Sequence, residues 1–268
     1  MKSKPQTRAR SLMLIATLAV VYTVLRIIPT FPMVGVPGSR FSASDFVASM
    51  YGAILGPYSS TFCIILGTII GFFTGRPPVF YGLDFMPAAI NALVVGLIVR
   101  GRRSHAAFLY LLLLALFLAH PYAPILTEVT VFRSQNSVVF PFVWLHVVGI
   151  IVLVSPAGSR LARLIAARSI RLTAVGFSLL SLIGTLAQHL MGNLLYASIV
   201  LPLLSEQARA ANWALIFWLY PIERITIVVL STVVGVPIIR SMRSSNLFSI
   251  EGRDKMRAAE DDGLLLET

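Results

Sequence analysis

Charge is scarce in this sequence, and negative charge is scarcest. Charged residues make up 12% of the 268 residues, against 57% for hydrophobic residues. Soluble domains carry about 25% charged residues, so this composition excludes an ordinary globular protein and is typical of a membrane protein. Acidic residues number 11 against 22 Lys and Arg, which gives a net charge of +11. Most basic residues flank apolar runs, where membrane topology and anionic lipid account for them without a nucleic acid partner.

Cysteine and the common catalytic motifs are also missing. Cys63 is the single cysteine, so the chain forms no internal disulfide. The sequence contains no G-x-x-x-x-G-K-[ST], H-E-x-x-H, C-x-x-C or G-x-S-x-G motif. It therefore lacks the usual machinery for nucleotide hydrolysis, zinc binding and nucleophilic acyl transfer. The four histidines are scattered, and we expect no metal, no cofactor and no enzymatic activity of the chain by itself.

Long apolar runs are what the chain has in abundance. An α-helix needs about 20 apolar residues to cross the hydrocarbon core of a membrane, and several runs reach that length. They predict an all-α polytopic membrane bundle of about eight transmembrane helices within 1–240, followed by a flexible polar tail, 241–268. The expected spans are 11–29, 42–56, 58–75, 82–99, 106–125, 138–155, 172–202 and 213–239.

The basic residues are divided unequally between the connecting loops. Sixteen of the 22 fall on one side, in 1–10, 100–103, 160–171 and 240–257, and four fall on the other. Cytoplasmic loops carry the excess of Lys and Arg in membrane proteins. Both termini are therefore predicted to be cytoplasmic, in a multi-pass protein of the cell membrane.

Several polar side chains fall at a common depth within these predicted helices. Counting inward from the outer helix ends places Asn91, the 188–193 segment and the 223–224 pair roughly 13–20 Å below the outer surface. Polar groups in the hydrocarbon region are costly and need a partner or a purpose. Apolar walls with a few convergent polar groups describe a small-molecule site. The expected ligand-binding residues are Asn91, His189, Asn193, Glu223, Arg224, Asp84, Arg26 and Tyr196.

These groups also have structural alternatives. Glu223 and Arg224 are adjacent and point about 100° apart on a helix, so we expect each to pair with another helix or with a ligand. His189 and Asn193 share a helix face, which fits an interhelical hydrogen bond as well as ligand binding. Arg26 can instead extend its guanidinium to the outer headgroups.

Two blocks of the sequence carry a family resemblance. The first, 20–75, contains VVYTVLRIIP, a Pro- and Gly-rich loop, SASDF, YGAILGPY and a helix with glycines four apart. The second, 187–240, contains HLMGNLLY, YPIER and GVPIIR. Together they cover a little under half of the chain. They resemble the substrate-binding S subunits of energy-coupling factor (ECF) vitamin transporters.

The resemblance implies a high-affinity binding subunit for a small water-soluble vitamin or related nutrient, with a site that opens to the outside under the first loop. Uptake would require a transmembrane T subunit and two cytoplasmic ATPases, with this chain toppling in the membrane. The family usually has six helices, which leaves the pair at 106–155 as an insertion. Its Ala-x-x-x-Ala contact with the T subunit has its nearest matches here at 16–20 and 19–23. The expected coupling residues are Ala16, Ala19, Gly67 and Gly71.

Two other functions fit the same residues. The chain could be an intramembrane enzyme that acts on a lipid, with Glu223 or His189 as a general base. It could also be a structural subunit of a larger membrane complex, whose buried polar groups fix the register of the helices. A retained small molecule would favour the binding subunit, and a lipid product would favour the enzyme. If neither a retained small molecule nor a lipid product is found, the structural subunit remains as the interpretation.

Overall fold

The computed structural model describes residues 4–130 and 137–244. This part of the chain is mostly helical, and two short antiparallel hairpins accompany the helices. The α-helices are α1 Lys4–Ile27, α2 Ala48–Leu55, α3 Pro57–Phe72, α4 Met86–Val99, α5 Arg103–Leu118, α6 Trp144–Val154, α7 Pro156–Ala166, α8 Ile170–Leu195 and α9 Glu206–Ser244. The strands are β1 Pro29–Pro32, β2 Arg40–Ser42, β3 Leu126–Thr130 and β4 Ser137–Pro141. The predicted helical architecture is confirmed.

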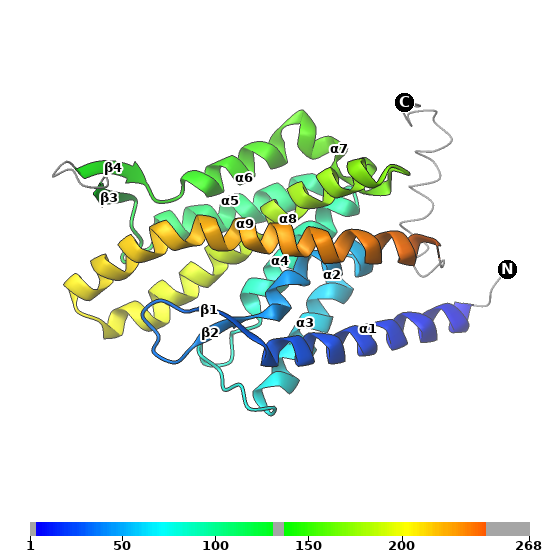
Figure 1. Ribbon diagram of the computed structural model, residues 1–268, viewed down its shortest axis with the longest axis horizontal. Helices are drawn as coiled ribbons and strands as arrows, with labels where there is room; N and C mark the ends of the chain where they lie inside the picture. Colours follow the sequence, from blue (N-terminus) through cyan, green and yellow to red (C-terminus); the bar gives the residue numbers. More distant parts are fainter. Residues whose placement is uncertain (1–3, 131–136, 245–268) are drawn as a thin grey trace.

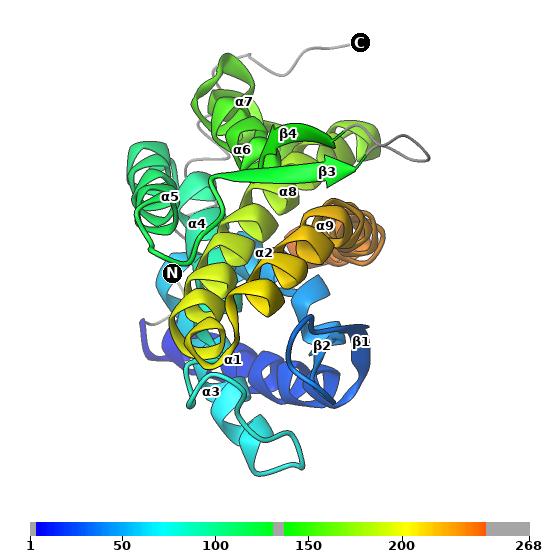
Figure 2. The ribbon, with the colours of Figure 1, turned by 90° about the vertical axis from the view of Figure 1, so that its left-hand side faces the viewer.

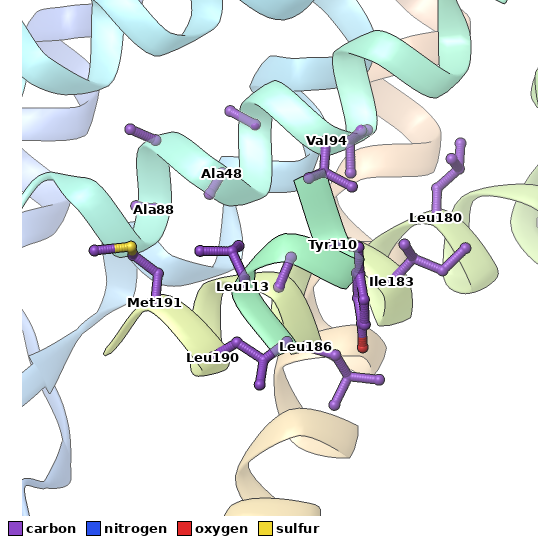
Figure 3. Packing of buried hydrophobic residues seen from close by; sticks show 14 of the residues in the cluster. Ala48, Ala88, Val94, Tyr110, Leu113, Leu180, Ile183, Leu186, Leu190 and Met191 are labelled. Atoms are coloured by element: carbon purple, nitrogen blue, oxygen red, sulfur yellow. The ribbon is translucent and has the colours of Figure 1, made fainter. Parts of the chain in front are cut away.

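The helices are arranged around α8, which packs against α4, α5, α6, α7 and α9. In both ribbon views, α1 and α3 lie on one side of the central group, and α6 and α7 lie on the opposite side (Figures 1 and 2). Aliphatic side chains and Tyr110 fill the contact between α4, α5 and α8 (Figure 3). Residues 183–191 are buried without interruption. Because α8 is covered on all faces there, its polar side chains must find partners inside the protein.

Two helical segments are long and apolar enough to cross a membrane, Ile170–Leu203 with 34 residues and Glu206–Met242 with 37. The bent pair α6 and α7 would make a third if it forms one span, and α3, α4, α5 and most of α1 are shorter apolar helices. Large apolar side chains are exposed along α1, α5, α6 and α9. Soluble monomers rarely expose contiguous apolar surface on this scale. The fold is thus compatible with a membrane location, while a count of eight spans is not established.

The second predicted span is interrupted. Residues 42–56 form a 3-10 turn, Ala43–Phe46, and then α2, whose eight residues extend only about 12 Å. α2 ends at Gly56, which has φ +78°, and α3 begins directly at Pro57. The tight turn predicted between these two helices is present, but α2 alone is too short to cross a bilayer.

The predicted span 138–155 and the loop after it also differ from expectation. The span begins as strand β4 and becomes helical only at Trp144. The loop then forms α7, at an angle of 73° to α6. The break falls at Ser155, because a residue before proline avoids the helical conformation and the Ser155 hydroxyl accepts the Ala157 N–H at 3.2 Å.

The basic turns gather at one end of the molecule, where α1 and α7 begin and α9 ends (Figure 1). Arginine side chains tie these turns together. The contacts join Arg102 to the Tyr58 hydroxyl, Arg103 to the Ser155 carbonyl and Arg240 to the Arg168 carbonyl, at 3.1, 3.0 and 2.7 Å. The helix α9 continues past the predicted domain boundary to Ser244. The rest of the predicted tail, 245–268, lies outside the described residues.

Candidate functional site

A cavity lies at the other end, between the β1–β2 hairpin and the facing parts of α1, α4, α8 and α9. Its volume is about 120 Å³, roughly ten times what one buried water requires. Its aromatic lining consists of Tyr22, Phe41, Phe80, Tyr196 and Tyr220. Its charged and polar lining consists of Arg26, Arg40, Ser42, Asp45, Arg76, Asp84, Gln188, His189, Asn193, Glu223 and Arg224.

Seven of the eight predicted ligand-binding residues line this cavity. They are Arg26, Asp84, His189, Asn193, Tyr196, Glu223 and Arg224. The eighth, Asn91, has no exposed surface and lies behind the cavity wall. The prediction omitted Arg40, Asp45, Arg76 and Gln188, which also line the cavity. Gln188 shares the predicted depth of His189 and was identifiable, whereas Arg40 begins strand β2 and Arg76 lies in a loop, and no helical periodicity places either of them.

A chain of buried polar side chains stands behind the wall. The Ser49 hydroxyl on α2 donates to the side-chain oxygen Oδ1 of Asn91 at 2.8 Å, and the Asn91 side-chain amide donates to Oε1 of Gln188 at 2.8 Å. The Gln188 amide then donates to the Asp45 carboxylate at 2.7 Å. Asn91 therefore orients a residue of the wall. The Ser42 N–H donates to the second Asp45 oxygen at 3.3 Å, so Asp45 also caps the 3-10 turn Ala43–Phe46.

Glu223 and Arg224 form an ion pair at 3.5 Å. We expected each to pair with another helix or with a ligand, but Glu223 pairs with Arg224, its neighbour on α9, despite their separation of about 100° around the helix. Arg224 also reaches α8, where it donates to the Thr185 hydroxyl at 3.2 Å. Both residues are buried, with Arg224 at 2% exposure. The pair places one anionic and one cationic group in the deep wall of the cavity.

His189 belongs to a group of three rings. Its Nδ1 lies 3.0 Å from Nε2 of His146 on α6, and the Tyr220 ring stacks on His189 with centroids 4.8 Å apart. The Asn193 amide donates to the same Nδ1 at 3.4 Å. An Nδ1 that accepts from both donors leaves the His189 ring proton on Nε2. His146 was treated as an isolated histidine in the sequence, since only the packing of α6 on α8 brings the two together.

The loop between α3 and α4 is ordered by Asp84. Its carboxylate oxygens accept the N–H groups of Val79 and Phe80, at 2.9 and 3.1 Å. These bonds fix a turn in which Tyr81 has φ 50°, and they hold Phe80 in the cavity wall. Asp84 thus lines the cavity while both of its oxygens are occupied by the backbone.

The β1–β2 connection lies against the end of the α8–α9 hairpin. Gly35 has φ +71°, and a Cβ atom at this position would overlap the Tyr196 hydroxyl and the Asn212 amide. The Asn212 amide donates to the Tyr196 hydroxyl at 3.0 Å. A neighbouring residue of the connection, Met33, lines the cavity. Tyr196 therefore lines the cavity and also packs against the β1–β2 connection.

The four predicted coupling residues have different environments. Ala16 is exposed on α1, whereas Ala19 is buried at 1% exposure. A Cβ atom on Gly67 would lie 2.8 Å from the Ala19 carbonyl oxygen, and one on Gly71 would lie 3.0 Å from the Arg26 Nε. In this structure Ala19, Gly67 and Gly71 thus pack α1 against α3. Direct contact of any of the four with a partner stays a prediction.

The chain matches no protein-family model, and neither a curated protein nor a solved structure is significantly similar to it. What the geometry defines is a helical protein, with helices able to cross a membrane, that encloses a polar cavity near one end. Within 4–130 and 137–244, no three His, Cys, Asp or Glu side chains gather into a group that could hold a metal ion.

Proposed function

We propose that the protein is a membrane-embedded, high-affinity binding subunit for uptake of a small water-soluble vitamin or related nutrient. The observation that carries the proposal is the cavity, on which buried polar side chains of α1, α8 and α9 converge. A subunit whose polar groups only fix helix register would satisfy them internally. Arg26 is instead 7% exposed, and its Nε is buried without a hydrogen-bond partner among the described residues.

The proposed partners are a transmembrane T subunit and two cytoplasmic ATPases. They come from the S-subunit resemblance and from the missing nucleotide-binding loop, since a chain without ATPase machinery can bind a solute but cannot drive its uptake with ATP. In this proposal the protein is not itself an enzyme. Reconstitution in liposomes tests it: accumulation of a solute against its gradient by this chain alone, without partners or ion gradients, would refute the assignment.

We further propose a multi-pass topology of about eight hydrophobic segments, with α2 reaching only part of the way. Both termini and the arginine-rich turns would face the cytoplasm, and the cavity would face outside. Single cysteines in a Cys63→Ala background test this orientation. A membrane-impermeant thiol reagent applied to intact cells should label positions in 30–41 and 203–212 and should spare 100–105. Labelling of 100–105 would reverse the topology.

Native mass spectrometry of the detergent-purified protein is the direct test of binding. A small molecule retained at one copy per chain, and lost when the cavity is filled by Asn193→Trp, would support the binding subunit. The matched control is Ser198→Trp, on the same hairpin and outside the cavity lining. An equal retention in both variants would place the molecule elsewhere.

One observation favours the rival function, an intramembrane enzyme that acts on a lipid. The hydrogen bonds from His146 and Asn193 to Nδ1 leave the Nε2–H of His189 free of described partners, so His189 is oriented to donate a proton, as a general acid does. Incubation with membrane phospholipid and analysis of the products distinguishes the two functions. Product formed by the wild type and lost in His189→Gln would establish the enzyme.

A further inference from the structure

Most of the charged side chains that line the cavity are not paired with a side chain of opposite charge among the described residues. Four are cationic and three are anionic, and among them Arg224 and Glu223 form an ion pair. The other carboxylates are satisfied by neutral donors, since Asp45 accepts from Ser42 N–H and Gln188. The two oxygens of Asp84 accept backbone N–H groups of the α3–α4 loop. No ion pair joins the remaining cations, the side chains of Arg26, Arg40 and Arg76, to a carboxylate of the described residues.

Arg26 is the most deeply placed of these three cations. It is 7% exposed, and its Nε has no hydrogen-bond partner in the described chain. Its guanidinium carbon lies 5.7 Å from the centre of the Phe72 ring, a contact that offsets only part of the cost of burial. A buried cation without a hydrogen-bonded counterion is expensive. The structure therefore holds an unsatisfied positive charge beside an open space.

Arg76 adds a second positive charge at the same place. Its two terminal nitrogens donate to the carbonyl oxygens of Arg26 and Arg40. These acceptors hold the guanidinium in position but do not neutralise it. Burial lowers the pKa of Arg76 below its usual value, and the neighbouring charge of Arg26 acts in the same direction. The guanidinium groups of Arg26 and Arg76 are thus close together, and neither forms an ion pair with a carboxylate of the described residues.

We infer that the cavity binds an organic anion, whose acidic group is held by Arg26 and whose ring or chain packs on the aromatic wall. The inference rests on the proposed binding function and adds the charge of the ligand to it. A planar guanidinium can bind a carboxylate or phosphate through two parallel hydrogen bonds. A cationic ligand would be repelled by Arg26 and Arg76, and a neutral ligand would leave Arg26 unsatisfied. The anion removes both penalties.

The test uses probes that share a phenyl ring and differ in charge: benzoate, phenyl phosphate, benzamide and benzylamine. Equilibrium dialysis in an uncharged detergent, at millimolar probe concentration, measures their binding to the purified full-length protein. Benzoate or phenyl phosphate should bind more tightly than benzamide and benzylamine, and the tighter of the two anions identifies the acidic group. Benzamide or benzylamine binding as tightly as the anions, or no anion binding at all, would overturn the inference.

Arg26→Gln assigns the charge to a residue. It should weaken benzoate binding about tenfold to hundredfold, the usual effect of losing a charge-assisted hydrogen bond. Arg209→Gln is the matched control, because Arg209 stacks on Tyr122 outside the cavity lining. Arg26→Lys keeps the positive charge but cannot form two parallel hydrogen bonds, so its affinity for benzoate should lie between those of Arg26→Gln and the wild type. An unchanged benzoate affinity in folded Arg26→Gln would overturn the inference, and if that variant fails to fold, the wild-type selectivity decides.

Failure of the proposed function gives a different result. If the protein associates with no ATPase partner but binds benzoate through Arg26, the anion site stands and the uptake function falls. If the partners associate and neutral or cationic probes bind best, the uptake function stands and the inference about charge falls.

Discussion

The two walls of the cavity are built on different principles. On the α8–α9 wall, polar side chains are bonded to one another: Glu223 to Arg224, Arg224 to Thr185 and His189 to His146. On the wall formed by α1 and the adjoining loops, the Arg26 Nε is buried without a hydrogen-bond partner among the described residues, and Arg76 donates only to backbone carbonyls among those residues. The side chains of the first wall are bonded to one another, with the Arg224 Nε as an exception, whereas Arg26 and Arg76 on the second wall make no hydrogen bond to a side chain of the described residues.

This difference separates stability from binding. Interior groups that satisfy one another support the fold, and removing one leaves its partner buried and unpaired. A group that already lacks a partner adds little to the fold, and its removal is felt when a ligand arrives. We therefore expect substitutions on α8 and α9 to lower the free energy of unfolding, and substitutions around Arg26 to lower affinity.

The largest loss of stability is expected from Arg224→Leu. This change leaves Glu223 buried without its cation, and breaking a buried pair from one side costs about 3–5 kcal/mol. The melting temperature of the purified protein measures it, with Arg209→Leu as a control at a partly exposed site. The double variant Arg224→Leu with Glu223→Gln should recover much of the loss, because no charge then remains unpaired. A single variant as stable as the wild type would mean that Glu223 is neutral in the folded protein.

A smaller loss is expected from Asn91→Leu, which cuts the polar chain between the two walls. Ser49 and Gln188 would each lose a partner, at about 1–3 kcal/mol for a buried group left unsatisfied. Ser49→Ala is the matched comparison, since it removes one end of the same chain and spares the Asn91–Gln188 bond. Thermal denaturation should rank the wild type first, Ser49→Ala second and Asn91→Leu last. Equal melting temperatures for the two variants would show that the Gln188 bond contributes nothing.

The sequence predicts the helices and most of the cavity lining for a physical reason. Polar residues are rare in apolar runs, so depth along each helix is enough to bring Asn193, Glu223 and Arg224 to one layer. The same reasoning cannot distinguish a residue in the wall from one behind it. Asn91 has the right depth and the wrong rotational position, because it points to Gln188.

Contacts made by loops and by distant helices escaped prediction. Arg76 reaches the cavity through a loop whose path depends on the Asp84 bonds to Val79 and Phe80, and periodicity gives no information about such a path. His146 meets His189 only through the packing of α6 on α8. Hydropathy also overstated helix length in 42–56, because apolar composition alone does not reveal the 3-10 turn that precedes α2.

The loop over the cavity offers a test that leaves both walls intact. Gly35→Val should lift the β1–β2 connection, since its side chain would overlap Tyr196 and Asn212. Gly38→Val is the matched control: Gly38 has a similar φ of +76°, and nothing lies within 4 Å of its Cβ position. Both variants carry the same backbone strain, about 1–2 kcal/mol.

The difference between Gly35→Val and Gly38→Val measures the contact that the β1–β2 connection makes with Tyr196 and Asn212. A thiol reagent should modify an Asn193→Cys site faster in Gly35→Val than in Gly38→Val, with Cys63 replaced by alanine in both. We expect roughly a tenfold increase in rate if the lost contact is worth about 1.4 kcal/mol. Equal rates would show that the loop does not control access to the cavity.

The smallest effect on stability is expected from Ala16→Trp, and it compares the two faces of α1. Ala16 is exposed, so the large side chain should change the melting temperature little, within about 0.5 kcal/mol of stability. Ala19→Trp should destabilise by about 1–3 kcal/mol, because Ala19 is buried against Gly67 and no space exists there. If Ala16 contacts the proposed T subunit, Ala16→Trp should abolish uptake in cells and leave probe binding by the purified protein unchanged. Normal uptake by Ala16→Trp would remove this face of α1 from the coupling surface, whereas a loss of both uptake and probe binding would assign Ala16 to the fold.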